Sequence, residues 1–190
     1  MVKKFFAILA ILSITLFAQE QKVDKFEIKD IFGKTTTIIG KKNGLEIPSA
    51  KGKIVLIEFW GTHCPPCMFS ISHYIELNKK YKDKIAMFAV EVQATPKEQL
   101  IDFVKSKGIN YNIYTQQDNS DFVKYVAIRA KWSGAIPFLI ILDETGSVID
   151  IKTGMVPKEY IEKLIEYLEK NKTKQKRDTN STKADSNSTK

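Results

Sequence analysis

Cys64 and Cys67 are the only cysteines of the 190-residue chain, and they stand three positions apart. In the first turn of a helix, two thiols at this spacing come close enough to form a disulfide bond. The positive end of the helix dipole lowers the pKa of the first thiol and favours its thiolate. We therefore predict thiol-disulfide exchange, with Cys64 as the nucleophile and Cys67 as the thiol that resolves the mixed disulfide.

Metal and haem chemistry are less favoured for this pair. A zinc site would need a second pair of ligands, and the chain has only two histidines, His63 and His73. His73 would lie about 240° around a helix from Cys67, so its ring would not converge on the sulfurs. Covalent haem attachment needs a histidine directly after the second cysteine, where this chain has Met68. We expect no metal ligand and no cofactor other than the cysteine pair.

The segment around the cysteines resembles the active site of the thioredoxin superfamily. The resemblance covers Ile57 to Cys67, and the run from Ala135 to Phe138 resembles the cis-proline loop of that family. The Gly-Lys pairs at 33–34 and 52–53 resemble the extracytoplasmic TlpA/ResA-type branch. Together these features span residues 24–170 and imply a thioredoxin fold with thiol:disulfide oxidoreductase activity.

The resemblance also implies roles for residues near the cysteines. A cis Pro137 would lie beside Cys64 and leave the backbone of Ile136 free to pair with an extended substrate segment. Trp60 and His63 are expected among the substrate-binding residues. A protonated His63 would stabilise the Cys64 thiolate and favour an oxidant; the alternative is a surface ring without a redox role.

Pro65 and Pro66 act against such stabilisation, because they remove two N–H donors from the helix start. The balance between these prolines and His63 does not follow from the sequence. Trp132, shortly before the proline loop, is open to two interpretations, a core side chain or an exposed docking surface.

Glu58 is the only charged residue in the apolar run from Ile54 to Trp60. Because both faces of this predicted strand are apolar, the carboxyl is expected to be buried. Burial would raise its pKa and allow proton exchange with Cys67. The alternative is a carboxylate that reaches solvent or pairs with Lys53 or Lys84.

The elements that must position these residues alternate between strand and helix along most of the chain. This order indicates an α/β fold with a mixed central sheet flanked by helices and an N-terminal strand extension. A capping box at Thr95–Glu98 would open one helix, which would end before Gly108. Strands are expected at 35–39, 54–60, 85–92, 111–114, 138–142 and 148–152, and helices at 66–82, 96–107, 121–130 and 158–170.

Residues 1–18 have the pattern of a signal peptide. Lys3 and Lys4 precede an apolar run that is shorter than the roughly 20 residues of a membrane-spanning helix. We expect export to the periplasm and no stable membrane insertion after cleavage; an uncleaved anchor is the alternative. Residues 19–170 would form the thioredoxin-like domain.

Residues 171–190 lack large apolar side chains and are expected to form a disordered polar tail. The tail holds three Asn-x-Thr sequons, each with an acidic residue two positions earlier, a pattern similar to the acceptor of bacterial periplasmic N-glycosylation. Chance composition is the alternative explanation. The candidate acceptors are Asn171, Asn180 and Asn187.

The formal net charge of +8 does not indicate a nucleic-acid-binding protein. Residues 1–18 and 171–190 together account for +6 of the net charge of +8, so the body is close to neutral. The expected partners are thiols and disulfides of exported proteins and a membrane redox donor or acceptor. The TlpA/ResA resemblance implies a reductant, with apocytochrome c as a candidate substrate. Alternatives are a DsbA-like oxidant and a copper chaperone that uses both sulfurs to bind Cu(I).

Overall fold

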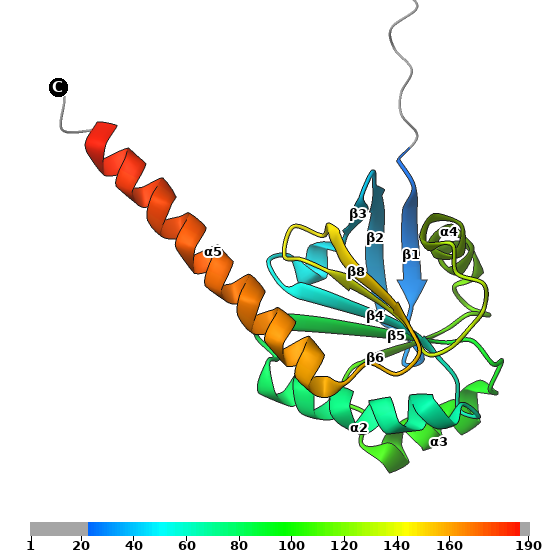
Figure 1. The fold of residues 1–190 in the computed structure, drawn as a ribbon. Helices are drawn as coiled ribbons and strands as arrows, with labels where there is room; N and C mark the ends of the chain where they lie inside the picture. Colours follow the sequence, from blue (N-terminus) through cyan, green and yellow to red (C-terminus); the bar gives the residue numbers. More distant parts are fainter. Residues whose placement is uncertain (1–22, 187–190) are drawn as a thin grey trace, which may run out of the picture.

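The computed structural model describes the backbone of residues 23–186 and the side chains of residues 23–172. Its central sheet consists of β4 (Ile54–Trp60), β5 (Ile85–Glu91), β6 (Asn112–Thr115), β7 (Phe138–Leu142) and β8 (Val148–Thr153). The strand order is β6-β5-β4-β7-β8; β4, β5 and β6 run parallel, and β7 is antiparallel to both β4 and β8. This arrangement confirms the expected mixed sheet (Figure 1).

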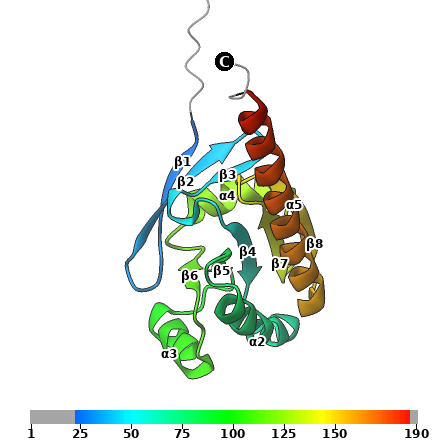
Figure 2. The same ribbon diagram turned by 90° about the vertical axis from the view of Figure 1, so that its left-hand side faces the viewer.

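The helices cover both faces of this sheet. Figures 1 and 2 show α2 and α3 together below one face, with α5 along the same layer and α4 on the opposite side. The apolar contacts agree, because side chains of α2 and α5 share one core cluster with β7, whereas α4 belongs to another. The helix bounds are α2 (Pro65–Lys80), α3 (Lys97–Lys107), α4 (Ser120–Ala130) and α5 (Lys158–Ser186).

The N-terminal extension is a second, three-stranded antiparallel sheet. It comprises β1 (Lys25–Lys29), β2 (Thr35–Lys41) and β3 (Gly44–Glu46), followed by the 3-10 helix η1 (Pro48–Ala50). Its buried side chains, including Ile28, Ile38 and Leu45, join the core cluster that α4 also covers. The expected N-terminal strand extension is confirmed, and it closes one face of the central sheet.

Strand β4 lies at the centre of the sheet and is buried at every position. Ile57 and Phe59 face the cluster beneath the N-terminal extension, whereas Leu56 and Trp60 face the clusters beneath α2, α3 and α5. Because strand side chains alternate, Glu58 points to the same side as Leu56 and Trp60. The strand thus directs its one charged side chain beneath the helix that carries the cysteines.

The predicted capping box at the start of α3 is wrong. The N-cap residue is Pro96, and no side chain caps the helix. The Thr95 hydroxyl instead donates a hydrogen bond to the carboxylate of Glu91, which is buried at the end of β5. A buried carboxylate needs donors more than an exposed helix end does, because water can satisfy the helix end.

The last helix, α5, is longer than the sequence predicts. It continues to Ser186 instead of ending near Lys170, so the structure differs from the expected disordered tail (Figure 1). The segment contains no glycine or proline, and it includes several lysines, a glutamine and an arginine, which favour helix. Asn171 is exposed on α5, and Asn180 has helical backbone. Asn187 and the expected signal peptide lie outside the described residues.

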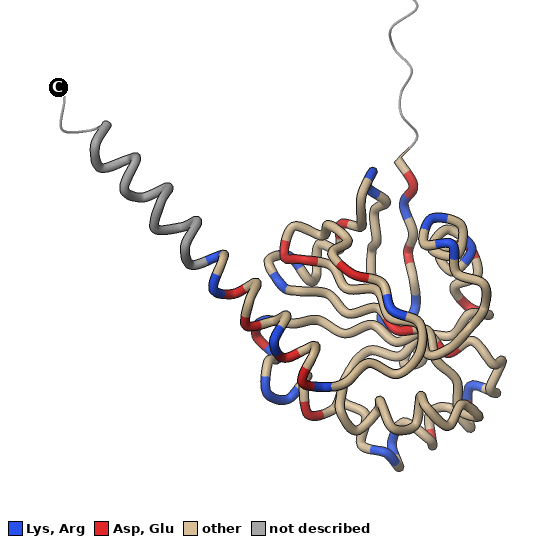
Figure 3. The backbone as a smooth tube through the Cα atoms, viewed as in Figure 1, with Lys and Arg blue, Asp and Glu red and all other residues tan. Residues whose placement is uncertain are grey.

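Ion pairs join α5 to α2 at the surface. Lys80 pairs with Glu162, and Lys158 pairs with Glu76. Figure 3 shows that basic and acidic residues are interspersed along the described part of α5. Exposed pairs of this kind contribute little stability each, so burial of Ile161 and Ile165 is the main anchor of the helix. Across residues 23–186, no helix is both long and apolar enough to cross a membrane.

Candidate active site

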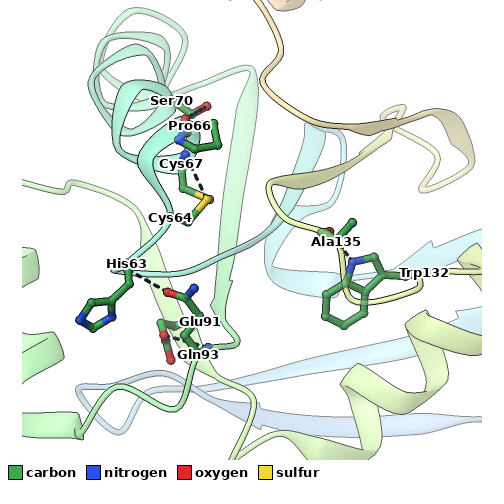
Figure 4. The surroundings of a disulfide bond; sticks show 9 residues. All are labelled: His63, Cys64, Pro66, Cys67, Ser70, Glu91, Gln93, Trp132 and Ala135. Carbon is green, nitrogen blue, oxygen red and sulfur yellow. Dashed lines mark hydrogen bonds between the residues drawn. A yellow bond between two sulfur atoms is a disulfide. The ribbon is translucent and has the colours of Figure 1, made fainter.

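The two cysteines form a disulfide bond at the start of α2 (Figure 4). Cys64 is the N-cap residue, Cys67 lies in the first turn, and their Cα atoms are 5.2 Å apart. Cys64 is 6% exposed, whereas Cys67 is completely buried. An incoming thiol or disulfide can therefore reach the sulfur of Cys64 more readily, which supports its prediction as the nucleophile.

The helix start offers few donors to the Cys64 sulfur. Pro65 and Pro66 occupy the first two helical positions and carry no N–H. The backbone N–H of Cys67 donates to Cys64 Sγ at 3.3 Å. A helix start with ordinary residues would present further N–H groups to a thiolate, so the proline pair weakens this source of stabilisation.

The His63 ring does not contact the disulfide. His63 is exposed, its Nδ1 lies 3.0 Å from the Thr62 hydroxyl, and its backbone N–H donates to Gln93 Oε1 at 2.8 Å. Figure 4 shows the ring turned away from Cys64. In this conformation His63 does not supply the contact that an oxidant would need.

The Ile136–Pro137 peptide bond is cis, as the family resemblance implied. Pro137 is buried, and Ile136 packs against the cluster that contains both cysteines. Within the described residues, neither backbone polar group of Ile136 has a hydrogen-bond partner. This backbone is therefore available to pair with an extended segment beside the disulfide.

Trp132 supports the proline loop from the core side. Its ring lies 4.7 Å from the ring of Phe59 and 6.0 Å from that of Phe138, measured between centroids. The indole N–H donates to the carbonyl of Ala135 at 2.7 Å (Figure 4). These contacts favour the interpretation of Trp132 as a core side chain that fixes the loop.

Trp60 is placed differently from the expectation. Its side chain is 1% exposed and packs against Phe103 of α3, with ring centroids 5.8 Å apart. A side chain this deeply buried cannot touch a visiting protein, so the predicted substrate contact of Trp60 is wrong. Trp60 belongs to the same buried apolar cluster as the two cysteines and is part of the core that supports them.

Glu58 is buried as predicted, with 1% of its surface exposed. The alternative pairings are absent, because Lys53 donates to the carbonyl of Lys82 and Lys84 pairs with Glu169. Burial raises the pKa of the Glu58 carboxyl well above its ordinary value, and a hydrogen bond with the Tyr74 hydroxyl opposes this only in part. Glu58 and Ala89 are partners in the β4–β5 ladder, and Ala89 shares an apolar cluster with Cys67.

Tyr74 and Ser70 are site residues that were not predicted from the sequence. Both are buried on α2, and the Tyr74 hydroxyl is hydrogen-bonded to Ser70 and to Glu58. Burial, together with the charge of Glu58, raises the pKa of Tyr74, so its hydroxyl stays protonated as a donor. The spacing of four residues places Ser70 and Tyr74 on one helix face, and this signal could have identified them.

Over the part of the chain that the structure describes, no group of three or more His, Cys, Asp and Glu side chains could hold a metal ion. At the helix start, the structure brings together two sulfurs, a buried carboxyl and a cis-proline loop on a mixed α/β sheet. This combination defines a thioredoxin-fold thiol-disulfide oxidoreductase.

Comparison with known proteins agrees with this class. The family model described as Redoxin matches residues 28–168, and the chain belongs to this family. Thioredoxin-like protein YneN of Bacillus subtilis is 31% identical over 134 residues, which cover 68% of this chain and 72% of YneN. Thiol-disulfide oxidoreductase ResA of Bacillus cereus is 31% identical over 158 residues, 81% of this chain and 82% of the relative.

Solved structures show the same fold. The thiol:disulfide interchange protein of Chlorobium tepidum aligns with a TM-score of 0.61 at 19% identity, over 76% of this chain and 92% of that chain. A DsbF homologue from Corynebacterium diphtheriae aligns with a TM-score of 0.61 at 21% identity, over 80% of this chain and 91% of that chain. At these identities the likeness extends to the fold alone.

Proposed function

We propose that this oxidoreductase is an extracytoplasmic reductant that opens disulfides in exported proteins. The sparse solvation of Cys64 carries the proposal: two prolines remove N–H donors, one N–H reaches the sulfur at 3.3 Å, and the His63 ring is turned away. A poorly stabilised thiolate makes the dithiol form less stable and therefore a better electron donor.

The reaction begins with the reduced cysteine pair. The Cys64 thiolate attacks a disulfide of the partner protein, forms a mixed disulfide and releases one partner thiolate. Cys67 then loses its proton and attacks Cys64 Sγ, which releases the second partner thiolate and closes the Cys64–Cys67 disulfide. Two electrons pass to the partner, and a membrane redox donor restores the dithiol form.

Glu58 accepts the proton of Cys67 in this scheme. The second attack requires a buried thiol to ionise away from water, and a carboxyl with a raised pKa is matched to a thiol for proton exchange. Tyr74 holds the carboxyl through its hydroxyl. The cysteine pair is the whole redox centre, and no further cofactor takes part.

The proposed location is the periplasm. The apolar segment of residues 1–18 supports export, and the matched relatives named ResA support a role in disulfide exchange. The candidate substrate is apocytochrome c, whose Cys-x-x-Cys-His thiols would be restored from their disulfide. Purified apocytochrome c with this motif oxidised tests the proposal directly. Loss of that disulfide in the presence of the reduced protein, and not of its Cys64→Ser variant, is the expected result.

The reduction potential decides between the proposed reductant and an oxidant. We expect equilibrium with a glutathione buffer to give a value near that of thioredoxin, about −270 mV, whereas a value near that of DsbA, about −120 mV, would establish the oxidant. Titration with Cu(I), with Cys67→Ser as the control, tests the copper chaperone. Tight binding that needs both sulfurs and an absence of dithiol turnover would replace our proposal.

A further inference from the structure

A second buried carboxylate lies near the cysteines and has no part in the reaction above. Glu91, the last residue of β5, has no exposed surface. Its oxygens accept hydrogen bonds from the backbone N–H groups of Gln93 and Thr95 and from the Thr95 hydroxyl, at 2.9, 3.2 and 2.9 Å. These donors make its burial tolerable, but an apolar residue would fill the position at lower cost.

A chain of hydrogen bonds runs from this carboxylate to the active-site loop. The Thr95 hydroxyl oxygen lies 2.7 Å from the Thr62 hydroxyl oxygen, which lies 3.0 Å from His63 Nδ1. The hydrogen-bonded residues become more buried from the active-site loop inwards: His63 is exposed, whereas Thr95 and Glu91 are buried. These hydrogen bonds thus connect His63, the residue before the nucleophile, to the buried carboxylate of Glu91.

The carboxylate sets the direction of every hydrogen in this chain. A carboxylate only accepts, so Thr95 must donate its single hydroxyl hydrogen to Glu91. Thr62 must then donate to Thr95, and the remaining contact requires the ring of His63 to donate from Nδ1 to Thr62. The geometry therefore selects the tautomer with its hydrogen on Nδ1 and holds the ring in one orientation.

We propose that Glu91 is a positioning residue that, through Thr95 and Thr62, holds the His63 ring away from Cys64. Figure 4 shows the ring in this position, on the side of the loop opposite the sulfur. A free imidazolium could turn towards the Cys64 thiolate and stabilise it, and the chain prevents that approach. The inference rests on the proposed role of Cys64 as the nucleophile.

The backbone of the loop has a separate anchor, which allows the two effects to be distinguished. The N–H of His63 donates to Gln93 Oε1, and Gln93 lies against Gly61, where a Cβ atom would come within 2.1 Å of Oε1. The backbone N–H groups of Gln93 and Thr95 still donate to Glu91 when the Thr95 hydroxyl is removed. A variant of that hydroxyl therefore removes the constraint on the direction of the Thr62–His63 hydrogen bond and retains the loop.

The test compares Thr95→Val, which removes the hydroxyl at nearly constant volume, with Thr95→Ser, which keeps it. Nitrogen NMR of the wild type should show the Nδ1–H tautomer of His63, as should Thr95→Ser, whereas Thr95→Val should lose it. Glutathione equilibrium at one fixed pH should then favour the dithiol form about threefold or more in Thr95→Val. Thiolate titration of Cys64 by ultraviolet absorbance should show a lowered pKa in the same variant.

The same substitution in a His63→Ala background isolates the ring. The shift caused by Thr95→Val should disappear there; a shift of equal size in both backgrounds would overturn the proposal, as would an Nε2–H tautomer in the wild type. Thr62→Val breaks the next link and should reproduce the shift, which keeps the test valid if Thr95→Val does not fold. Turnover of a disulfide substrate by the wild type and by Cys64→Ser tests the nucleophile role of Cys64 separately.

Discussion

Two buried carboxylates lie on neighbouring strands of the central sheet, Glu58 on β4 and Glu91 at the end of β5, and their surroundings give them different roles. Glu91 accepts three hydrogen bonds, whereas Oε1 of Glu58 has no partner among the described residues. An unsatisfied buried oxygen is costly, and the cost falls when the carboxyl binds a proton. Glu58 is therefore the carboxyl suited to receive a proton, whereas Glu91 is suited to fix the backbone and the hydroxyl groups that donate to it.

Substitution of Glu58→Gln should slow release of the reduced partner. The amide preserves shape but cannot take the proton of Cys67, so we expect a decrease of about tenfold to 100-fold in steady-state turnover near neutral pH. The first attack by Cys64 should be unaffected. Stopped-flow formation of the mixed disulfide in a Cys67→Ser background measures that first step alone, and an equal decrease there would contradict the role of Glu58.

The same carboxyl should make stability depend on pH. Because folding raises the pKa of Glu58 above its ordinary value of about 4.5, the folded state binds more protons than the unfolded state above that pH. The contribution is complete below pH 4.5 and is lost as the pH rises towards the folded-state pKa, by at most about 1.4 kcal/mol per pH unit.

Urea unfolding of the oxidised protein between pH 5 and 8 measures this loss. Glu58→Gln should remove most of the decline, since its amide does not titrate. A wild-type free energy of unfolding that rises over this range, with no difference in slope from the variant, would show that Glu58 is ionised throughout.

At the scale of elements, the start of α2 sets the properties of the nucleophile. The N-cap side chain normally accepts from the second or third helical N–H, and here the second position is Pro66 and the third is Cys67. Pro66→Ala would restore a donor directed at Cys64 Sγ. Pro65→Ala is the matched control, because the first helical N–H is not the usual partner of a cap.

We expect Pro66→Ala to lower the pKa of the Cys64 thiol and to make the protein more oxidising. A hydrogen bond to a charged group contributes about 1.5 kcal/mol or more, which corresponds to about one pKa unit. Thiolate absorbance against pH and glutathione equilibrium provide the two measurements. A larger change in Pro65→Ala than in Pro66→Ala would contradict the assignment of the missing donor.

Elements with a strong local pattern were predictable from the sequence. The strand bounds of β4 and β7 agree at both ends, since apolar runs bounded by turns have few alternatives. The capping box failed because Thr95 satisfies a carboxylate that only the fold brings to it. The cis bond of Pro137 followed from family resemblance and had no signal in local composition.

Site residues divide in the same way. Cys64, Cys67 and Glu58 were identifiable because their types are unusual for their positions in the sequence. Tyr74 was visible only as an apolar position of a helix, and its bond with Glu58 depends on how α2 crosses β4. Burial of Trp60 likewise depends on α3, which covers it from another part of the chain.

At the scale of the whole molecule, the N-terminal sheet and the helices cover the central sheet (Figure 1). The disulfide lies at the start of α2, shortly after the end of β4 (Figure 4). The disulfide closes a very short loop, with a sequence separation of three, so it restricts the unfolded chain only slightly. Its effect on stability must therefore arise from the folded surroundings of the two sulfurs.

These surroundings connect the redox potential to folding. If the folded protein has a lower potential than its unfolded chain, folding favours the disulfide over the dithiol, and the oxidised form is the more stable one. Each 30 mV of difference corresponds to about 1.4 kcal/mol. The sparse solvation of Cys64 and the complete burial of Cys67 both disfavour a thiolate in the folded state.

We therefore expect the oxidised protein to unfold at a higher denaturant concentration than the dithiol form. Guanidinium unfolding with and without excess dithiothreitol measures the difference, and a variant with both Cys64→Ser and Cys67→Ser should unfold identically in the two conditions. A more stable dithiol form would mean that folding stabilises the Cys64 thiolate after all. The protein would then accept electrons from its partners, and the direction of the proposed reaction would be reversed.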